Sequence, residues 1–274
     1  MGEFYDEIPD DEKLIEWIKD QKIFHVASAP LKGGHVNVSP KGQPTFKLVN
    51  RKAVWYLDLT GSGNETISHM YEPGNGRMTI LFEAFEGPPR ILRLFGRGQI
   101  IERNTPEFDR LMSGEKPEGA EFDYPTPEMQ PGARAIIWLD IEKVGTSCGY
   151  AVPFMKFEGH RDVLKNWSVT LEKNDSQAED PYALPMKKGL KAYWLHFNTW
   201  SMDGLPGFKQ VEHKANTGLV NKIMTDVGLD PSKMTNSVSM EKWSILLVGA
   251  VLGFGLSTLV NGNISSIAGK LLKT

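Results

Sequence analysis

A short run of small polar residues, TGSGNET from Thr60 to Thr66, contains the residue types best suited to binding an anion. It follows residues 54–58, which alternate at the two-residue period of a strand, and it precedes a helical pattern over residues 65–71. The first backbone N–H groups of a helix have no internal partner, and the helix dipole adds positive potential there. A strand, a glycine-serine turn and a helix start therefore predict a site that can hold a phosphate group without a lysine.

The same turn also has a structural interpretation. Ser62 followed three residues later by Glu65 matches a capping box, in which each side chain accepts from the other residue's N–H group. The run is not a P-loop, because no Gly-Lys-Ser/Thr follows, and it lacks the third glycine of a dinucleotide-binding turn. It therefore indicates neither nucleoside triphosphate nor NAD chemistry, and it leaves a phosphate site and a helix cap both open.

Two cations lie in segments that could reach an anion. Arg93 falls on a predicted strand among apolar residues, where a guanidinium needs a partner, and a phosphate is as suitable as a carboxylate. The alternative partners are glutamates across a hairpin, namely Glu83, Glu86 and Glu102. Lys41 lies in the turn SPKG, where the alternative is an ordinary solvated lysine.

Cysteine and histidine give weaker signals. The lone Cys148 could be a reactive thiol, but cysteine is more often a small buried apolar residue. A single cysteine excludes an intramolecular disulfide and a cysteine-built zinc site, which suits a reducing compartment. The six histidines show no paired spacing, so we expect no metal site.

The composition is that of an ordinary globular protein. The 274 residues are 40% hydrophobic and 24% charged, with a net charge of −3 and a pI of about 6.1. No block of lysine and arginine appears, so nucleic acid is not an expected partner. The acidic N-terminal stretch lacks the apolar core of a secretory signal, and we expect the body of the protein to stay in the cytosol.

Periodicity predicts a mainly β (α+β) fold. A helix follows Asp10 and Asp11, and further helices are expected at residues 65–71, 106–112, 162–173 and 187–200, with a polar loop over residues 172–180. Six strands are predicted at residues 22–29, 36–39, 53–57, 78–85, 91–101 and 134–144.

Five blocks, in matching order, resemble one known family. They are HVNVSPKG (35–42), YLDLTGSGNET (56–66), FEGPPRILRLFGRG (85–98), TSCGYAVP (146–153) and SMDGLPG (201–207). Together they are similar to the pyridoxamine 5'-phosphate oxidase-related FMN-binding split-barrel family, and within it to a poorly characterised branch with bacterial and fungal members. The resemblance implies a six-stranded antiparallel split barrel with flanking helices, paired as a homodimer with FMN at the subunit interface.

The resemblance also implies where the cofactor binds. The family's serine-arginine-lysine phosphate grip is replaced here by Asn64-Glu65-Thr66, so the positive charge of that grip is absent. We expect hydroxyl, amide and backbone groups of the turn to take over, with help from two cations. The candidate cofactor-binding residues are Lys41, Thr60, Ser62, Gly63, Asn64, Thr66 and Arg93.

The expected activity is that of a flavin-dependent oxidoreductase with an unknown small-molecule substrate and hydride transfer at the flavin N5. Oxidation of pyridoxamine 5'-phosphate itself is not expected, because no arginine- and tryptophan-containing substrate segment follows Trp138. No catalytic residue can be named. The alternatives are a non-catalytic flavin-binding protein, a haem-binding protein with His69 or His160 as axial ligand, and a scaffold without a cofactor.

The C-terminal part departs from the rest of the chain. Residues 243–260, WSILLVGAVLGFGLSTLV, carry no charge and are just long enough to cross a bilayer. Trp243 before this run and lysines after it favour a transmembrane tail anchor. We therefore expect five parts: the split-barrel domain (1–150), a helical extension packing on it (151–230), a linker (231–242), the anchor (243–260) and a polar tail (261–274).

Such an anchor would place the protein on the cytosolic face of an intracellular membrane. A short, moderately apolar anchor followed by lysines favours the mitochondrial outer membrane, with the endoplasmic reticulum as the alternative.

Overall fold

A computed structural model describes residues 2–122, 128–212, 214–215 and 218. Residues 1–214 form one compact unit. The domain boundary predicted at residue 150 falls inside this unit and stays a prediction. The predicted linker (231–242), anchor (243–260) and tail (261–274) lie outside the described residues. Among the residues that are described, no helix is both long enough and apolar enough to cross a membrane.

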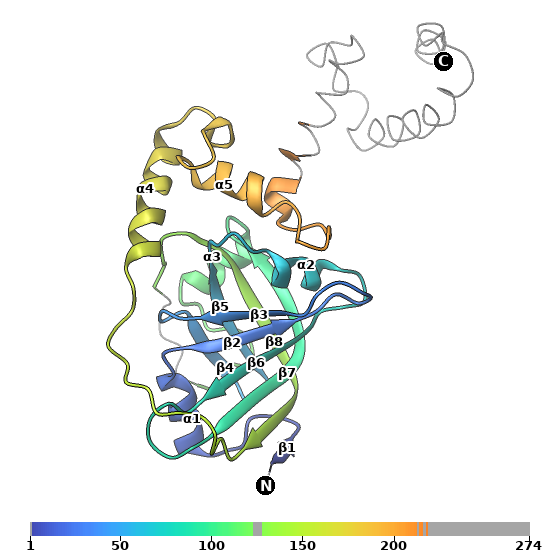
Figure 1. The fold of residues 1–274 in the computed structure, drawn as a ribbon, viewed down its shortest axis with the longest axis vertical. Helices are drawn as coiled ribbons and strands as arrows, with labels where there is room; N and C mark the ends of the chain where they lie inside the picture. Colours follow the sequence, from blue (N-terminus) through green and yellow to red (C-terminus); the bar gives the residue numbers. More distant parts are fainter. Residues whose placement is uncertain (1, 123–127, 213, 216–217, 219–274) are drawn as a thin grey trace, which may run out of the picture. The chain divides into compact units, whose positions relative to one another are not determined.

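One antiparallel sheet forms the body of this unit and curls on itself, as Figure 1 shows. Seven strands are bonded in the order β3-β2-β6-β7-β8-β5-β4, and β1 pairs with β8. The strands are β1 (Glu3–Tyr5), β2 (Phe24–Ser28), β3 (Asn37–Lys41), β4 (Phe46–Asn50), β5 (Ala53–Leu59), β6 (Arg77–Glu83), β7 (Ile91–Glu102) and β8 (Ala133–Ser147). The result is an antiparallel α+β fold consistent with a split barrel, and we call the curled sheet the barrel.

The sheet has eight strands rather than the predicted six, because β1 and β4 escaped the sequence pattern. β1 has three residues, too few to show a period. In β4 the register shifts between Leu48 and Asn50, so that Leu48 and Val49 are both buried and the alternation is lost. A similar irregularity in β7 lies at Gly96, where an added Cβ would be 1.9 Å from the backbone oxygen of Asp140.

The helices flank the barrel. They are α1 (Glu12–Asp20), α2 (Glu65–Tyr71), α3 (Pro106–Met112), α4 (Val163–Gln177) and α5 (Leu190–Phe197), with a 3₁₀ turn η1 (Pro181–Ala183). The predictions for α2 and α3 are confirmed to the residue, and Asp11 caps α1 by accepting from the amides of Lys13 and Leu14. The predicted loop over residues 172–180 is wrong for residues 172–177, where polar residues continue α4.

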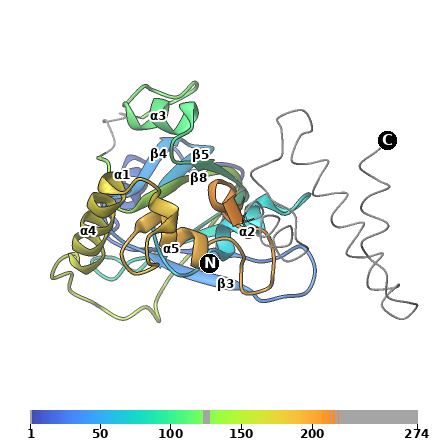
Figure 2. The same cartoon turned by 90° about the horizontal axis from the view of Figure 1, so that it is seen from above.

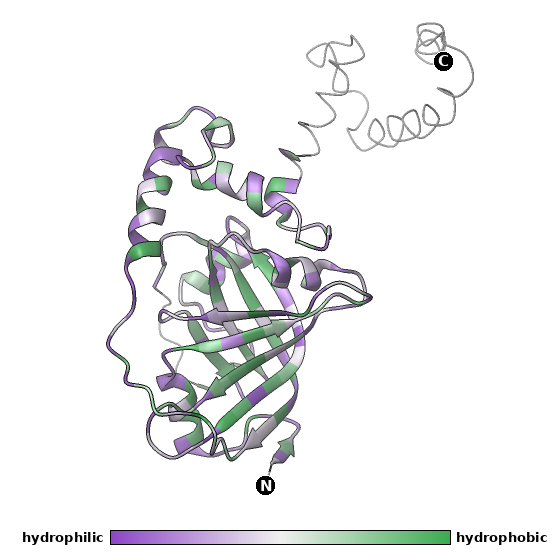
Figure 3. Ribbon diagram, viewed as in Figure 1, coloured by the Kyte–Doolittle hydropathy of each residue, from purple (hydrophilic) through white to green (hydrophobic). Residues whose placement is uncertain are grey.

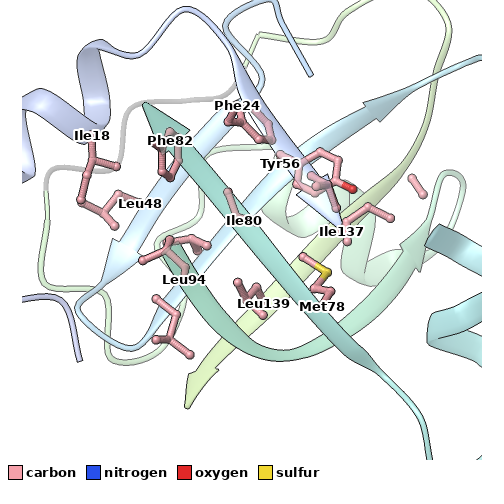
Figure 4. Packing of buried hydrophobic residues seen from close by; sticks show 14 of the residues in the cluster. Ile18, Phe24, Leu48, Tyr56, Met78, Ile80, Phe82, Leu94, Ile137 and Leu139 are labelled. Atoms are coloured by element: carbon pink, nitrogen blue, oxygen red, sulfur yellow. The ribbon is translucent and has the colours of Figure 1, made fainter. Parts of the chain in front are cut away.

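Two apolar clusters hold these elements together. The larger cluster fills the barrel, where Phe24 packs edge-on against Tyr56 (Figure 4) and also against Phe46. The strands carry much of the hydrophobic colour in Figure 3. It also includes Trp194 of α5 and Phe208 beyond it. The smaller cluster lies on the other face of β5, against α3 (Figure 2). β5 is therefore buried on both faces, and its polar end at Asp58 is buried with it.

Candidate functional site

Three charged side chains meet inside one end of the barrel. Asp58, on the core-facing side of β5, is 2% exposed. Its Oδ2 accepts from Nε of Arg134 at 2.7 Å, and its Oδ1 accepts from Nζ of Lys41 at 2.8 Å. Lys41 also lies over the ring of Tyr56, 5.7 Å from its centroid. We call these three residues the charge cluster.

The charge cluster carries one surplus positive charge. Burial opposes ionisation of Asp58, but Arg134 and then Lys41 outweigh it and lower the pKa of this carboxyl to about 2. Asp58 is therefore an anion at neutral pH, shared between two cations. One carboxylate cannot neutralise both cations, so the cluster keeps one positive charge beneath the turn that follows β5, while the carboxylate of Glu65 lies against Gly63 of the same turn.

Side chains from other elements hold that turn by donating hydrogen bonds to its backbone carbonyl groups. Arg134 donates from Nη2 to the backbone oxygen of Gly63 at 2.9 Å and from Nη1 to that of Gly61 at 3.4 Å. Nδ2 of Asn198, beyond α5, also donates to the Gly61 oxygen, at 3.1 Å. Within the described part of the chain, the N–H groups of residues 62–64 make no hydrogen bond. The carbonyl groups of Gly61 and Gly63 are therefore occupied, whereas the N–H groups of residues 62–64 remain available as donors.

Thr60 fixes the start of the turn. Its hydroxyl donates to the backbone oxygen of Gly132 at 2.6 Å and accepts from the indole Nε1 of Trp194 at 2.9 Å. Both Thr60 and Trp194 are 2% exposed. Thr60 is therefore a structural link between the barrel and α5, and both of these contacts are made by its hydroxyl.

The capping-box interpretation is wrong. The residue that caps α2 is Asn64, which makes no side-chain capping bond, and Ser62 is exposed two residues earlier. Arg134 binds the carbonyl groups of residues 61 and 63, and α2 begins only at Glu65, so Ser62 lies outside the helix end. Glu65 instead accepts the amide of Met202 at 3.4 Å.

Polar side chains of β3 continue the site along the inside of the barrel. Asn37 donates to the hydroxyl of Thr66 at 3.1 Å, and Ser39 donates to the side-chain oxygen of Asn37 at 3.2 Å. Lys41 follows on the same face. Val38, which lies between these polar residues in β3, is 60% exposed. The polar residues of β3 therefore face inward and an apolar residue faces outward, the reverse of an ordinary half-buried strand.

A turn of the C-terminal extension covers the inner side of this region. Asn64 is 2% exposed and donates to Ser68 at 3.2 Å, while its Oδ1 is buried without a partner. Gly207 lies so close that an added Cβ would be 1.8 Å from Nδ2 of Asn64. Asp203 binds the backbone amide and Nδ1 of His35, at 2.8 and 2.7 Å. The hydrogen bond from His35 is the main reason that the pKa of Asp203 is lowered.

The structure therefore brings together six of the seven candidate residues and leaves out Arg93. Arg93 pairs with Leu81 on the outer face of the sheet, whereas Lys41 pairs with Phe24 on the core face. One subunit cannot bring both cations to one phosphate. The predicted alternatives are also wrong: among the described residues Arg93 makes no ion pair with a carboxylate, and Lys41 is bound to buried Asp58.

Sequence reasoning missed Asp58, Arg134 and Asn198 as parts of the site. Asp58 carried a signal, since a carboxylate at a core position of a strand needs a buried cation. Arg134 and Asn198 carried none, because only the fold brings them to residue 61. Within the described ranges no group of three metal-ligating side chains occurs. Cys148 is exposed.

Comparison with known proteins gives the family. No family model matches the chain. The pyridoxamine 5'-phosphate oxidase family protein ustO of Aspergillus flavus is 39% identical over 210 residues, covering 76% of this chain and 78% of that protein.

Solved structures show more distant similarity. HupZ of group A Streptococcus has a TM-score of 0.34 and 16% identity, over 49% of this chain and 91% of that one. A putative pyridoxamine 5'-phosphate oxidase of Lactobacillus delbrueckii has a TM-score of 0.34 and 14% identity, over 51% of this chain and 98% of that one. An FAD binding protein from Mycobacterium smegmatis has a TM-score of 0.33 and 10% identity, over 52% of this chain and 97% of that one. On the strength of the Aspergillus relative, the chain belongs to the pyridoxamine 5'-phosphate oxidase-related family.

Proposed function

We propose that this protein binds FMN and is a flavin-dependent oxidoreductase acting on a small molecule. Family membership supports a flavin cofactor. The observation that carries the proposal is the turn at residues 61–64, whose carbonyl groups are held by Arg134 and Asn198 while its N–H groups stay free. Free backbone donors beside a surplus positive charge are suited to a phosphate group.

The residues present fit the phosphate of FMN. Ser62 and Gly63 are exposed and offer two amides and a hydroxyl. Thr66 accepts from Asn37, and its own hydroxyl proton is free to be donated. Lys41 and Arg134 supply from beneath the charge that the family's usual grip would supply directly. In this arrangement Thr60 and Asn64 shape the turn.

When bound, FMN supplies hydride transfer at the N5 atom of its ring. The chain's own residues hold the phosphate, orient it through the fixed turn, and keep water from its inner side by the packing of Gly207 on Asn64. The low pKa of Asp58 keeps this carboxylate ionised throughout the neutral range, so its own contribution to the site is not expected to change with pH there.

In this proposal the protein works as a homodimer with FMN at the subunit interface. Val36, just before the edge strand β3, and Val38, on its outer side, are 74% and 60% exposed and offer an apolar face for a second copy. Sedimentation analysis of the purified protein tests this. A monomer at micromolar concentration with FMN bound would contradict it.

The uncharged run at residues 243–260 tethers the protein to a membrane, with the body on the cytosolic face of the mitochondrial outer membrane or the endoplasmic reticulum. A fluorescent protein fused to residues 242–274 is expected to label one of these membranes. Diffuse cytosolic fluorescence would remove the tether from the proposal.

The cofactor is tested by the visible spectrum of the full-length protein, purified in detergent, with mass spectrometry of the small molecule released on denaturation. Flavin bands and released FMN are expected. A Soret band would favour haem, and a colourless protein that does not take up added FMN would favour a scaffold.

The site itself is tested by Lys41→Gln, which removes the surplus charge while leaving Asp58 paired with Arg134. FMN affinity is expected to fall about tenfold or more, as for the loss of one charged contact. Lys143→Gln is the matched control, since Lys143 is exposed and its partner Asp6 is too. Equal FMN affinity in both variants would remove Lys41 from the site.

A further inference from the structure

A separate groove of about 610 Å³ lies on the outer face of the sheet. Its floor is formed by Leu81 and Glu83 of β6 and by Ile91 and Arg93 of β7, and its wall by residues 147–153 that follow β8. Its floor faces away from the charge cluster, because directly paired residues of an antiparallel sheet share a face. Its volume is in the range of small-molecule sites.

The wall is held by backbone contacts. Gly149 has a φ of +66°, and an added Cβ would be 3.0 Å from backbone atoms of Arg90, so the chain there approaches β7 as closely as only glycine permits. The amide of Val152 donates to the Gly149 oxygen at 2.9 Å, and that of Met155 to the Phe85 oxygen at 3.1 Å. The groove is therefore a formed feature of the fold.

Two opposite charges on the floor are not satisfied. Arg93 makes one long hydrogen bond, 3.4 Å to the hydroxyl of Ser147, and within the described residues it has no carboxylate within ion-pair distance. Oε1 of Glu83 lies 3.3 Å from Nδ1 of His25, but Oε2 of Glu83 is buried without a partner. Arg93 lies opposite Leu81, and Glu83 lies opposite Ile91, so the two charges are diagonal neighbours.

Such an arrangement is costly unless a ligand completes it, because partly buried ionised groups need hydrogen-bond partners. A guanidinium fork matches a carboxylate, and a carboxylate oxygen accepts from an ammonium group. Apolar side chains, among them Leu81, Phe85 and Ile91, surround both charges. The groove is therefore suited to a molecule that carries a negative and a positive group close together on an apolar body.

We propose that this groove binds a free α-amino acid with a large apolar side chain. Its carboxylate binds the guanidinium of Arg93, its ammonium group donates to the carboxylate of Glu83, whose side chain is 17% exposed, and its side chain packs against the apolar wall. This site is separate from the proposed FMN site and does not depend on it.

Calorimetry with the full-length protein tests the proposal with three probes: L-phenylalanine, 3-phenylpropionate, which lacks the ammonium group, and phenethylamine, which lacks the carboxylate. L-Phenylalanine is expected to bind at least about tenfold more tightly than either analogue, because each analogue leaves one charge without a partner. Equal binding of all three probes, or no binding of any, would overturn the proposal.

Two variants assign the contacts. In Arg93→Gln the affinity for L-phenylalanine is expected to fall to that for phenethylamine, and in Glu83→Gln to that for 3-phenylpropionate. Arg110→Gln and Glu115→Gln, an exposed pair on and after α3, are the controls and should bind as the unmodified protein does. Thermal melting shows whether each variant is folded.

A second copy of the chain is the competing occupant of the groove. It would appear as hydrogen-exchange protection of residues 81–93 and 147–153 that rises with protein concentration and is unchanged by L-phenylalanine. That result would overturn the proposal and assign the groove to a contact between subunits. Protection that appears on addition of L-phenylalanine and is lost in Arg93→Gln would support it.

Discussion

At the scale of single residues, Asp58 does two things at once. It neutralises part of the charge of Lys41 and Arg134, and it fixes the direction of Arg134, whose other donors then reach the carbonyl groups of the turn at residues 61–63. The two cations depend on this carboxylate, because its removal leaves both of them uncompensated in a buried site.

Asp58→Asn is therefore expected to lower the free energy of unfolding by about 3–5 kcal/mol, since it leaves two cations facing each other in a buried site. Urea denaturation at neutral pH measures the change. Glu115→Gln, which removes one partner of an exposed ion pair, should change stability by no more than about 0.5 kcal/mol. A similar small effect of both substitutions would show that the charge cluster contributes little to stability.

The same carboxyl predicts an acid dependence. The pKa of Asp58 is about 2 in the folded protein and 3.8 as the ordinary value, so the folded state binds the proton less readily than the unfolded chain. Its contribution, about 2 kcal/mol, is present above pH ~4 and is lost as the pH falls towards ~2. Urea titrations over this range should show the stability difference between the unmodified protein and Asp58→Asn narrowing. A constant difference would contradict the assignment.

At the scale of elements, the turn at residues 201–207 and α5 determine the shape of the proposed phosphate site. They contact it at Thr60, Gly61, Asn64 and Glu65, and a further contact at His35 ties the turn to the loop before β3. A contact as close as that of Gly207 with Asn64 leaves no room for a side chain.

Gly207→Ala is accordingly expected to lower the free energy of unfolding by about 1–3 kcal/mol, as overpacking does, and to weaken FMN binding, because Asn64 must move. Gly61→Ala is the matched control for stability alone, since an added Cβ there meets nothing within 4 Å. Thermal melting and fluorescence titration with FMN measure both effects. If Gly207→Ala were as stable as the unmodified protein, the turn at residues 201–207 could move to accommodate the added methyl group at little cost.

At the scale of the whole molecule, the extension beyond β8 is part of one core. Leu171, Leu190, Trp194, Phe208 and Val211 belong to the same apolar cluster as the barrel interior. Removing them would uncover barrel residues that are buried in the complete unit, and burial of apolar surface is the main favourable contribution to folding.

A chain of residues 1–214 is therefore expected to melt cooperatively, and a chain of residues 1–150 is expected to aggregate or to melt at a much lower temperature. Circular dichroism and hydrogen exchange measure this. Equal melting temperatures would show that the barrel is an independent domain, as the boundary predicted at residue 150 implies.

The sequence by itself determined the elements whose signals are local. An acidic helix start and an apolar stripe located α1, helical patterns located α2 and α3, and alternation located six strands, because these patterns depend on residues close together in the chain. Block order determined the family. The missed β4 shows the limit of this reasoning, since two adjacent buried residues, Leu48 and Val49, do not follow the period of a strand.

Only the tertiary structure decided how the candidate site is built. It placed Lys41 on the core face and Arg93 on the outer face, and it brought Arg134 and Asn198 to a turn that lies more than seventy residues before either of them. The physical reason is that a buried charge and an unpaired carbonyl group accept any partner of the right chemistry within reach. Which partner is within reach depends on strand pairing and helix packing, and no local pattern records these.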